Sequence, residues 1–258
     1  MKIQKHILGN REGWDLMSDE YQVNSEISLE DVHYSPLSFG EKTANLIGDI
    51  TGKEYVELGC GGAQNSIALA KSGANVTAVD LSSNQLSHAS STCEKLGISV
   101  NLLQANMQSL NYFPDNKFDG ILSVFALEFI EDIDIFFSES NRILKKGGVL
   151  IISTTHPLGA FEWDPEANNL SVTDYFNPPI EIWRERGQSN SGVTYFRTIE
   201  ELFSKISENG FTVRKLMEPK PLGPNNENSS PYKGSYWTEF RDRLHSVPFA
   251  VVIKAIKG

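Results

Sequence analysis

The sequence has little basic charge, few cysteines and no long apolar run, and each shortage excludes a class of protein. Its 258 residues include 23 Lys and Arg against 33 Asp and Glu, so the formal net charge is −10. A broad nucleic-acid footprint needs a basic face that displaces counterions, so we do not expect a nucleic-acid partner. The two cysteines, Cys60 and Cys93, do not form a disulfide scaffold and lack metal-ligand spacing, so no bound metal is expected.

Signals for export or membrane insertion are also missing from the sequence. Residues 1–13 contain charges and no apolar core, unlike a secretory signal peptide. No apolar run approaches the roughly 20 residues that span a bilayer. Hydrophobic residues make up 40% of the chain and charged residues 22%, which is a globular balance. We therefore expect a cytoplasmic protein without a membrane partner.

Between residues 53 and 154 the chain alternates short apolar runs with amphipathic stretches, a pattern typical of βαβ units. The Lys145–Gly148 segment predicts a helix C-terminus, because it supplies cations and glycines. The runs predict strands at 54–58, 75–80, 99–104, 118–124 and 149–154, and helices at 63–72, 83–96 and 132–144.

The segments before and after this central part differ from it in composition and in the spacing of their apolar residues. Four residues predict one apolar stripe of a short N-terminal helix, namely Trp14, Leu16, Met17 and Tyr21, and residues 39–50 have the spacing of a second helix. Residues 155–197 and 219–247 are rich in Pro, Asn, Ser, Gly and aromatics, as in inserted caps or lids. The segments outside these two stretches predict a helix at 198–209 and strands at 211–218 and 248–256.

The glycine-rich turn Glu57–Gly62 follows the first strand and precedes a helix. Glycines there let the backbone approach a ligand, and the helix presents its N-terminus to the same place. Asp80 ends the next strand, where a carboxylate can accept hydrogen bonds from both hydroxyls of a ribose. This order of elements predicts a nucleoside cofactor. The alternative is a generic turn in which Asp80 only caps the next helix.

The turn departs from the dinucleotide pattern Gly-x-Gly-x-x-Gly/Ala, because Gln64 stands at the third glycine position. Glu57, just before the turn, would repel a pyrophosphate and favour a ligand that carries an ammonium group. An NAD-dependent oxidoreductase or epimerase on a Rossmann core therefore stays the alternative function. The chain also lacks the Tyr-x-x-x-Lys pair that such an enzyme would place after the fourth strand.

Four segments resemble, in order, the motifs of class I S-adenosylmethionine-dependent methyltransferases: Val56–Gly62, Val79–Ser82, Phe118–Ile121 and Ile143–Gly148. The resemblance covers residues 50–155. It implies an α/β, Rossmann-like, doubly wound sheet of seven strands with the last strand antiparallel, and S-adenosylmethionine as the cofactor. A non-catalytic binding protein of methyltransferase type is a further alternative.

The resemblance implies a single methyltransferase domain over residues 1–258. Within it we expect an N-terminal helical lid at 1–50, a cofactor-binding core at 51–154, and cap insertions with sheet-completing strands at 155–258. The implied cofactor contacts are Glu57, Gly59, Cys60, Gly61, Asp80, Leu81, Gln85, Asn106, Met107, Ser123, Val124, Phe125 and, from the lid, Tyr21.

By position, the backbone of Gly59–Gly61 would approach the methionine part of the cofactor, and Asp80 would hold the ribose. Asn106 stands where the family often has an acid near adenine, and its amide still permits a hydrogen bond. Met107 and Phe125 have ordinary core packing as an equal alternative. For Cys60 a backbone role is favoured over nucleophilic chemistry.

The acceptor of the methyl group is expected to be a small molecule, methylated at O, N, S or C. Methyl transfer needs alignment and exclusion of water, and a general base assists an oxygen acceptor. Candidate catalytic residues are His156, Glu128 and Arg197, with structural alternatives for two of them. His156 would cap the loop before Pro157, and Arg197 would pair with Glu200 or Glu201.

Aromatic residues are numerous outside the predicted sheet, and part of them would suit a flat acceptor in an enclosed apolar pocket. His33 also lies outside the core and is more consistent with a solvated loop residue. The aromatic residues concerned are Trp14, Tyr21, Tyr34, Phe161, Trp163, Tyr175, Trp183 and Tyr195.

Overall fold

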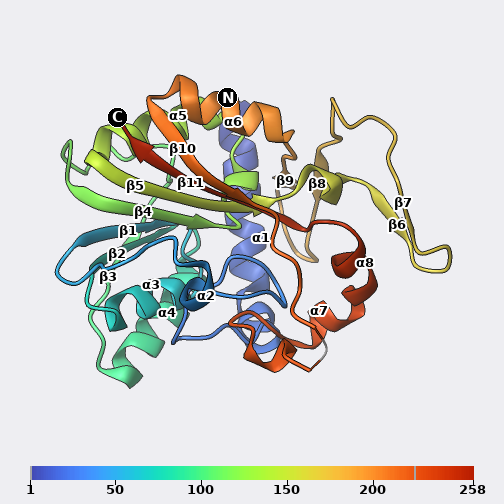
Figure 1. Ribbon diagram of the computed structural model, residues 1–258, viewed down its shortest axis with the longest axis horizontal. Coiled ribbons are helices and arrows are strands. Elements are labelled where there is room, and N and C mark those ends of the chain that lie inside the picture. Colours follow the sequence, from blue (N-terminus) through green and yellow to red (C-terminus); the bar gives the residue numbers. More distant parts are fainter. Residues whose placement is uncertain (1, 224) are drawn as a thin grey trace.

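A seven-stranded sheet with the strand order β10-β11-β5-β4-β1-β2-β3 forms the centre of the computed structural model, which describes residues 2–223 and 225–258 (Figure 1). All neighbours in this sheet are parallel except β11, which is antiparallel to both β5 and β10. The predicted fold class is confirmed. The strands are β1 (Glu54–Leu58), β2 (Asn75–Asp80), β3 (Asn101–Gln104), β4 (Phe118–Val124), β5 (Leu144–Thr155), β10 (Phe211–Met217) and β11 (Ala250–Lys257).

Helices cover both faces of the sheet, as Figure 1 shows. The central strands β1 and β4 are buried along almost their whole length, because helices cover both faces of the sheet. One face packs against Phe136 and Phe137, and the other against Leu69. The helices are α5 (Ile133–Ile143) and α6 (Ile199–Glu208) on one face, and α3 (Gln64–Lys71) and α4 (Ser83–Leu96) on the other.

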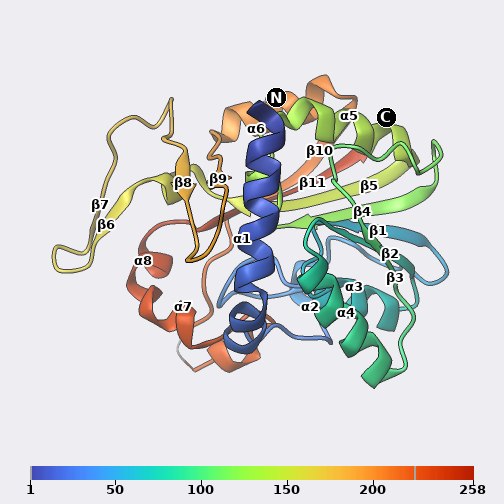
Figure 2. The same cartoon turned by 180° about the vertical axis from the view of Figure 1, so that it is seen from behind.

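The order of the strands reverses between β1 and β4. The chain forms β1, β2 and β3 toward one edge of the sheet and then crosses back to place β4 and β5 on the other side of β1. Ligands of open α/β sheets bind in the crevice outside the carboxyl ends of the strands at such a point. Helix α1 (Lys2–Asn24) crosses those carboxyl ends (Figure 2). The topology therefore places the ligand crevice between the sheet and α1.

Helix α1 has 23 residues and is longer than the short helix predicted from the sequence. Leu16 does not belong to the buried stripe, because 52% of its surface is exposed. Leu16 is two residues away from Trp14, and residues at that spacing face different sides of a helix. The apolar side that faces the sheet is carried instead by Trp14, Met17 and Tyr21, which all line the cavity described below.

The helix predicted at 39–50 is wrong apart from the short α2 (Glu41–Ala44). Asn45 adopts a left-handed conformation with φ 49° and ends the helix. The Glu41 carboxylate accepts hydrogen bonds from the backbone N–H groups of Leu46 (3.0 Å) and Ile47 (2.7 Å). The Glu41 carboxylate thus supplies hydrogen-bond acceptors for backbone N–H groups of a loop. The apolar residues of this segment are buried as loop side chains and do not form one face of a helix.

The Lys145–Gly148 segment is part of β5 and does not form the predicted helix C-terminus. Helix α5 ends at Ile143, and Leu144 is already extended, with ψ 142°. Leu144 pairs with Phe118 across the β4–β5 ladder. The register then shifts before Gly120, so the extra residues form an irregularity in the strand.

The segments after β5 form small elements around one end of the sheet. The hairpin β6–β7 projects away from the molecule, whereas β9 packs beside α1 (Figures 1 and 2). Within the described part of the chain, no helix has both the length and the apolar character needed to cross a membrane. These elements are η2 (Pro157–Ala160), β6 (Glu162–Asp164), β7 (Asn169–Ser171), β8 (Glu181–Trp183), β9 (Gly192–Thr194), η3 (Glu227–Ser229), α7 (Ser235–Glu239) and α8 (Arg241–Ser246).

Candidate active site

A cavity of about 610 Å³ lies at the carboxyl ends of β1, β2 and β4, with α1 as one wall. Its other walls come from the glycine turn, from the loop that contains His33, and from the segment between Tyr232 and Phe249. The volume is in the range of small-molecule sites, which is roughly 300–1,000 Å³. The cavity therefore has room for small ligands and brings together residues from both ends of the chain.

The glycine turn is held against the end of β2 by its own backbone. The N–H groups of Gly59 and Cys60 both donate to the carbonyl oxygen of Val79, at 2.8 and 3.0 Å. Gly59 has φ +78°, and a Cβ at this position would lie 2.2 Å from the Cβ of Ala126. Only glycine fits there, because any side chain would collide with Ala126, and Gly59 itself lines the cavity with its backbone.

Asp80 bridges the turn and the start of α4. Its Oδ2 accepts from the N–H of Gly61 (2.7 Å), and its Oδ1 accepts from the N–H of Ser82 (2.8 Å). The N-cap of α4 is Ser82, whose hydroxyl accepts from the N–H of Gln85 (3.1 Å). The alternative that Asp80 only caps this helix is therefore wrong. Asp80 lines the cavity, and burial raises the pKa of its carboxyl group.

Glu57 is a buried carboxyl group at the base of the turn. The Ser66 hydroxyl donates to its Oε2 (2.5 Å), and the Asn65 amide donates to its Oε1 (3.2 Å). Burial raises the pKa of Glu57 to about 7, although these hydrogen bonds oppose the shift. Glu57 lines the cavity, where a ligand cation would favour its ionised form.

Cys60 also lines the cavity, but its thiol is not a nucleophile. Burial raises the pKa of Cys60 well above its usual range, and the neighbouring acids Asp80 and Glu57 add to the shift. A thiolate would be needed for covalent chemistry. A raised thiol pKa disfavours covalent chemistry at Cys60.

The part of the cavity lined by the glycine turn, Asp80 and four further residues is called the cofactor half below. These four residues, which the resemblance implies as cofactor contacts, are Leu81, Gln85, Asn106 and Met107. Asn106 Oδ1 accepts a hydrogen bond from the N–H of Gln108 (2.9 Å), which leaves the Asn106 NH₂ group as a free donor. Gln85 Oε1 accepts from Nε2 of Gln22 on α1 (2.7 Å).

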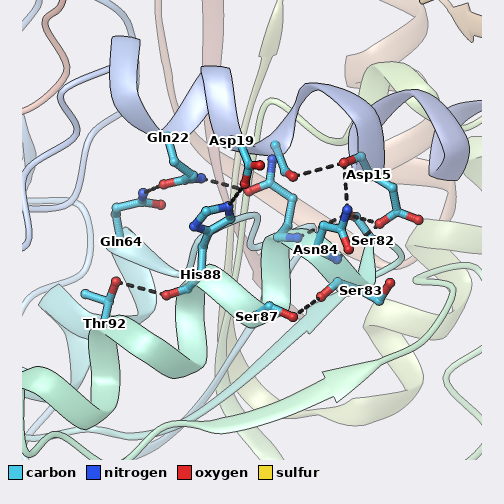
Figure 3. Close-up of polar contacts among 12 residues, drawn as sticks. Asp15, Asp19, Gln22, Gln64, Ser82, Ser83, Asn84, Ser87, His88 and Thr92 are labelled. Atoms are coloured by element: carbon cyan, nitrogen blue, oxygen red, sulfur yellow. Dashed lines mark hydrogen bonds and ion pairs between the residues drawn. The ribbon is translucent and has the colours of Figure 1, made fainter. Parts of the chain in front are cut away.

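Polar side chains of α1 hold this helix against α4 and α3 (Figure 3). Asp15 Oδ1 accepts from the Ser82 hydroxyl (2.6 Å) and from the N–H of Asn84 (3.1 Å). His88 of α4 pairs with Asp19 at 2.7 Å. Sequence reasoning missed these contacts because the partners are more than 60 residues apart and share no local pattern.

The middle of the cavity is formed by the segment after β4. Val124, Phe125 and Glu128 line it, the last from the short helix η1 (Leu127–Phe129). Ser123 does not line it, because this residue is completely buried and its hydroxyl donates to the carbonyl oxygen of Leu58 (2.8 Å). Phe125 has φ +51°, a strained conformation that directs the chain away from the sheet at this point.

Glu128 is the one catalytic candidate that the structure places in the cavity. Its side chain is buried, and the Thr154 hydroxyl donates to its Oε2 (3.0 Å). Burial raises the pKa of Glu128 to about 7. Near neutral pH this group can therefore exist in either protonation state.

His156 and Arg197 lie outside the cavity. His156 Nδ1 accepts from the N–H of Leu158 (3.1 Å), and its Nε2 pairs with Glu218 (2.9 Å). Arg197 donates to the carbonyl oxygens of Ile130 and Glu131 and lies 3.7 Å from Glu201. These contacts are the ones expected from the structural alternatives, in which His156 caps the loop before Pro157 and Arg197 pairs with Glu201.

The other half of the cavity is lined by aromatic rings and is called the aromatic half below. The hydroxyl groups of Tyr21 and Tyr232 lie 3.0 Å apart and join α1 to the segment before α7. Tyr34 does not take part, because it is fully buried and donates its hydroxyl to Glu41 Oε2 (2.7 Å). The cavity-lining rings are Trp14, Tyr21, Phe125, Phe129, Tyr232, Tyr236, Trp237 and Phe249, with His33 among them.

The expectation that His33 is a solvated loop residue is wrong. Only 6% of its surface is exposed, and its ring packs on Tyr232 with centroids 4.6 Å apart. No local sequence pattern could have indicated this position, because the contacting ring is about 200 residues away in the chain. The histidine is buried by tertiary contacts alone.

Comparisons with known proteins agree with this geometry. A model of the methyltransferase domain family matches residues 56–152. The ubiquinone biosynthesis O-methyltransferase of Rickettsia canadensis is 30% identical over 177 residues, which cover 68% of this chain and 70% of that protein. The chain belongs to the S-adenosylmethionine-dependent methyltransferases.

Other members of this group show how far the likeness extends. The uncharacterized methyltransferase YbaJ of Bacillus subtilis is 28% identical over 180 residues, 66% of this chain and 70% of that one. The crystal structure of an S-adenosylmethionine-dependent methyltransferase from Mesorhizobium loti has a TM-score of 0.67. It is 21% identical, with 83% of this methyltransferase and 95% of that chain covered, so it shares the fold.

The cavity of this methyltransferase fits its cofactor on chemical grounds. The open backbone at Gly59 and the carboxyl groups of Glu57 and Asp80 suit a ligand with ribose hydroxyls and positive charge, and they would repel a pyrophosphate. Among the described residues, no three His, Cys, Asp or Glu side chains are grouped to hold a metal ion.

Proposed function

We propose that this methyltransferase acts on a small, flat, uncharged molecule that binds in the aromatic half of the cavity. The observation that carries the proposal is that one continuous cavity is lined both by the glycine turn and by a group of aromatic rings. An acceptor bound there would lie beside the cofactor and be shielded from water. Alignment and shielding are what methyl transfer requires of the protein.

The cofactor supplies a methyl group that is already activated on a positively charged sulfur. In our proposal the residues near Gly59 and Gly61 receive its methionine part, and the Asp80 carboxylate accepts hydrogen bonds from the ribose. The free NH₂ group of Asn106 matches a ring nitrogen of adenine, and Met107 packs on the base. Tyr21 and Phe125 line the same cavity.

The charges of the cavity support an uncharged acceptor. Five acidic residues line it, Glu20, Glu57, Asp80, Glu128 and Glu185, against the single cation Arg11. A phosphate or carboxylate acceptor would be repelled by this balance. The Rickettsia relative, by its name an O-methyltransferase of ubiquinone biosynthesis, supports a small-molecule acceptor as well.

Among the catalytic candidates, we propose that Glu128 contacts bound ligands and that His156 and Arg197 support the structure. Glu128 faces the cavity, whereas the polar atoms of the other two are engaged by backbone groups and surface acids. A buried carboxyl group with a pKa of about 7 can pair with a cationic ligand once it ionises.

Calorimetric titration tests the cofactor assignment. S-adenosylhomocysteine should bind to the wild type, and NADH should not. Asp80→Ala should weaken binding of S-adenosylhomocysteine by about 1–3 kcal/mol, because a charge-assisted pair of hydrogen bonds is lost. Asp49→Ala is the matched control, since Asp49 contacts only its own turn. Binding of NADH in place of the sulfur ligand would contradict the assignment.

A methyl-transfer screen tests the acceptor. Planar phenols, amines, thiols and heterocycles would be incubated with S-adenosylmethionine, and product masses would be read out. We expect transfer to uncharged planar compounds and none to their carboxylated or phosphorylated analogues. Preferred transfer to an anionic compound would contradict the proposed acceptor class.

A further inference from the structure

Glu128 lies on η1, the short helix that follows β4, and neighbouring elements hold this helix in place. Tyr195, just after β9, donates its N–H to the carbonyl oxygen of Glu128 (2.7 Å). From α1, the side chain of Asn10 donates to the carbonyl oxygen of Phe129 (3.2 Å). A backbone that is fixed from two sides keeps the carboxyl group in one position, as a side chain that orients a ligand requires.

The segment that carries Glu128 touches the glycine turn. Ala126 is so close to Gly59 that a Cβ on Gly59 would lie 2.2 Å from the Cβ of Ala126. Glu128 follows two residues later and lines the same cavity as the turn. Burial raises the pKa of Tyr21, and the charge of Glu128 raises it further, so the two side chains are close to each other. The carboxyl group is therefore near both the glycine turn and a ring of the aromatic half.

One carboxylate oxygen of Glu128 is open to a ligand. The residue is 3% exposed, and its Oε2 accepts a hydrogen bond from the Thr154 hydroxyl (3.0 Å). Within the described part of the chain, Oε1 accepts none from another residue, yet it is not one of the fully buried polar atoms that lack a partner. Oε1 therefore keeps accessible surface, and this surface faces the cavity that Glu128 lines. A buried acceptor atom in this position calls for a donor on the ligand.

The rings beside this oxygen suit positive charge. Trp14 packs edge-on against Tyr21 (5.4 Å between centroids) and against Phe129 (5.6 Å), and all three line the cavity. The faces of aromatic rings attract cations, and a neighbouring carboxylate adds to this attraction. A group that becomes positively charged during the reaction is therefore stabilised at this place.

These charges decide which nucleophile fits the cavity. A phenol or a thiol gives up its proton in order to react, so negative charge develops on it beside the acids Glu57, Asp80 and Glu128. Burial raises the pKa of Glu128 to about 7, whereas a phenol ionises near pH 10, so this proton transfer is unfavourable by about a thousandfold. An amino group on a ring attacks as a neutral molecule and becomes positive, which the acids favour.

We propose that the acceptor carries a primary or secondary amino group on a flat ring and that Glu128 is the catalytic residue that binds this group, which makes the protein an N-methyltransferase. This inference rests on the proposed function, because it names the atom that is methylated in the same cavity. The nitrogen lone pair forms a bond to the methyl carbon as the carbon–sulfur bond breaks and its electron pair stays on sulfur. The nitrogen then carries the positive charge. One of its N–H protons passes to the Glu128 carboxylate and later leaves to solvent.

The first test compares amino, hydroxyl and thiol groups on the same ring: 5-aminoindane, 5-indanol and indane-5-thiol, together with the 2-naphthyl compounds of the same three classes. Product masses should show methylation of the amines, with the phenols and thiols slower. Glu128→Gln keeps the shape of the side chain but cannot accept the proton, so the rate with the amines should fall about 100-fold or more. Glu131→Gln is the matched control, because Glu131 is exposed on the same segment and does not line the cavity.

The second test is the pH profile of kcat with an amine at saturating S-adenosylmethionine, which a purely structural role of Glu128 would not change. In the wild type kcat should rise as Glu128 ionises and then level off, with a midpoint at or below about pH 7, because the positive sulfur favours the ionised form. Glu128→Gln should lose this rise. Thr154→Val removes a hydrogen bond that lowers the pKa of Glu128, so its midpoint should move to higher pH.

Other titratable groups lie around Glu128, and the comparison of variants separates them from it. Burial also raises the pKa of Glu57 to about 7, but this residue and Asp80 belong to the cofactor half, so their ionisation acts on cofactor binding, which saturation removes from kcat. The groups on the other packed elements are Arg11, Glu20 and Tyr21 of α1, His33 in the loop after α1, and Tyr195 and Arg197 after β9.

Three outcomes overturn the inference: preferred methylation of the phenols or thiols, no methylation of any compound in the panel, or the same pH profile in Glu128→Gln as in the wild type. Urea unfolding at the assay pH checks that each variant is folded. Binding of S-adenosylhomocysteine to the wild type and to each variant separates this failure from failure of the proposed function. If that binding is intact while the amines are not methylated, the cofactor assignment stands and the amine assignment does not.

Discussion

The two halves of the cavity are built in different ways. The cofactor half consists of backbone and short polar side chains at the ends of β1 and β2, with contacts such as that between Asp80 and Gly61. The aromatic half consists of large rings from three distant segments, and Tyr21 and Tyr232 meet across 211 positions. The first half is fixed by the geometry of one sheet edge. The second exists only when the ends of the chain fold onto that edge.

Because the two halves are built differently, we expect substitutions in them to have different effects on activity. Changes in the cofactor half should act on all reactions of the enzyme alike, because every reaction uses the same cofactor. Changes in the aromatic half should depend on the acceptor. Substitutions in each half test whether the two halves differ in this way.

The largest effect is expected for Gly59→Ala. The added Cβ would lie 2.2 Å from Ala126 in a backbone with φ +78°, so we expect loss of S-adenosylhomocysteine binding and a fall of about 2–4 kcal/mol in the free energy of unfolding. Gly48→Ala is the matched control, since Gly48 has φ +74° and open space around it. Urea unfolding and calorimetry measure both. Equal effects of the two substitutions would contradict the steric explanation.

A smaller and pH-dependent effect is expected for Glu128→Gln. The folded protein holds this proton up to about pH 7, whereas the unfolded chain releases it near 4.5. The contribution of this one group to the stability is therefore fully present below pH 4.5 and is lost as the pH rises to about 7. Relative to the wild type, the variant should gain about 1–3 kcal/mol between pH 5 and pH 8 in urea unfolding.

The control for this pH effect is Glu94→Gln on the exposed side of α4. Its unfolding curves at the two pH values should shift in parallel with those of the wild type. Parallel behaviour of Glu128→Gln would show that this carboxyl group is not held protonated by burial.

The link between α1 and the aromatic half predicts coupling between two tyrosines. Tyr21→Phe and Tyr232→Phe each leave the other hydroxyl group without this partner, and each should cost about 1–2 kcal/mol in stability. The double variant should cost less than the sum by about 0.5–1.5 kcal/mol. Binding of S-adenosylhomocysteine should change little in all three, and additive losses would show that the hydroxyl pair contributes nothing.

The smallest effect on turnover is expected for His156→Ala. Its nitrogens contact Leu158 and Glu218 outside the cavity, so kcat should change less than about twofold while stability falls by about 1 kcal/mol. Initial rates with any acceptor from the screen measure this. A large loss of kcat with full cofactor binding would return His156 to the catalytic residues.

The core of the fold was accessible from the sequence because its signals are local. An apolar run followed by the Gly59–Gly62 turn and a strand ending at Asp80 specifies β1, β2 and the cofactor edge without any distant contact. The predicted bounds of 54–58, 75–80 and 118–124 match β1, β2 and β4. Where the local signal was ambiguous, as at residues 39–50, the helical spacing was misleading, because the Glu41 carboxylate binds the backbone of Leu46 and Ile47 in a loop.

The aromatic half of the cavity could not be predicted from the sequence in the same way. His33 and Tyr232 have no periodicity that marks them, and their burial depends on packing between segments about 200 residues apart. His156 shows a different limit, since its position after β5 suggested catalysis while its two ring nitrogens contact Leu158 and Glu218. Position along a strand predicts which edge a residue reaches, but it does not predict the direction of the side chain.

The shared wall formed by α1 has a kinetic consequence. Asp15 and Gln22 fasten this helix over the cofactor half, and Tyr21 fastens it over the aromatic half. One helix thus holds polar contacts on both sides of the cavity. We expect substitutions that loosen α1 to change the rate of cofactor exchange and the rate of product release together, which stopped-flow measurements on Asp15→Ala would check.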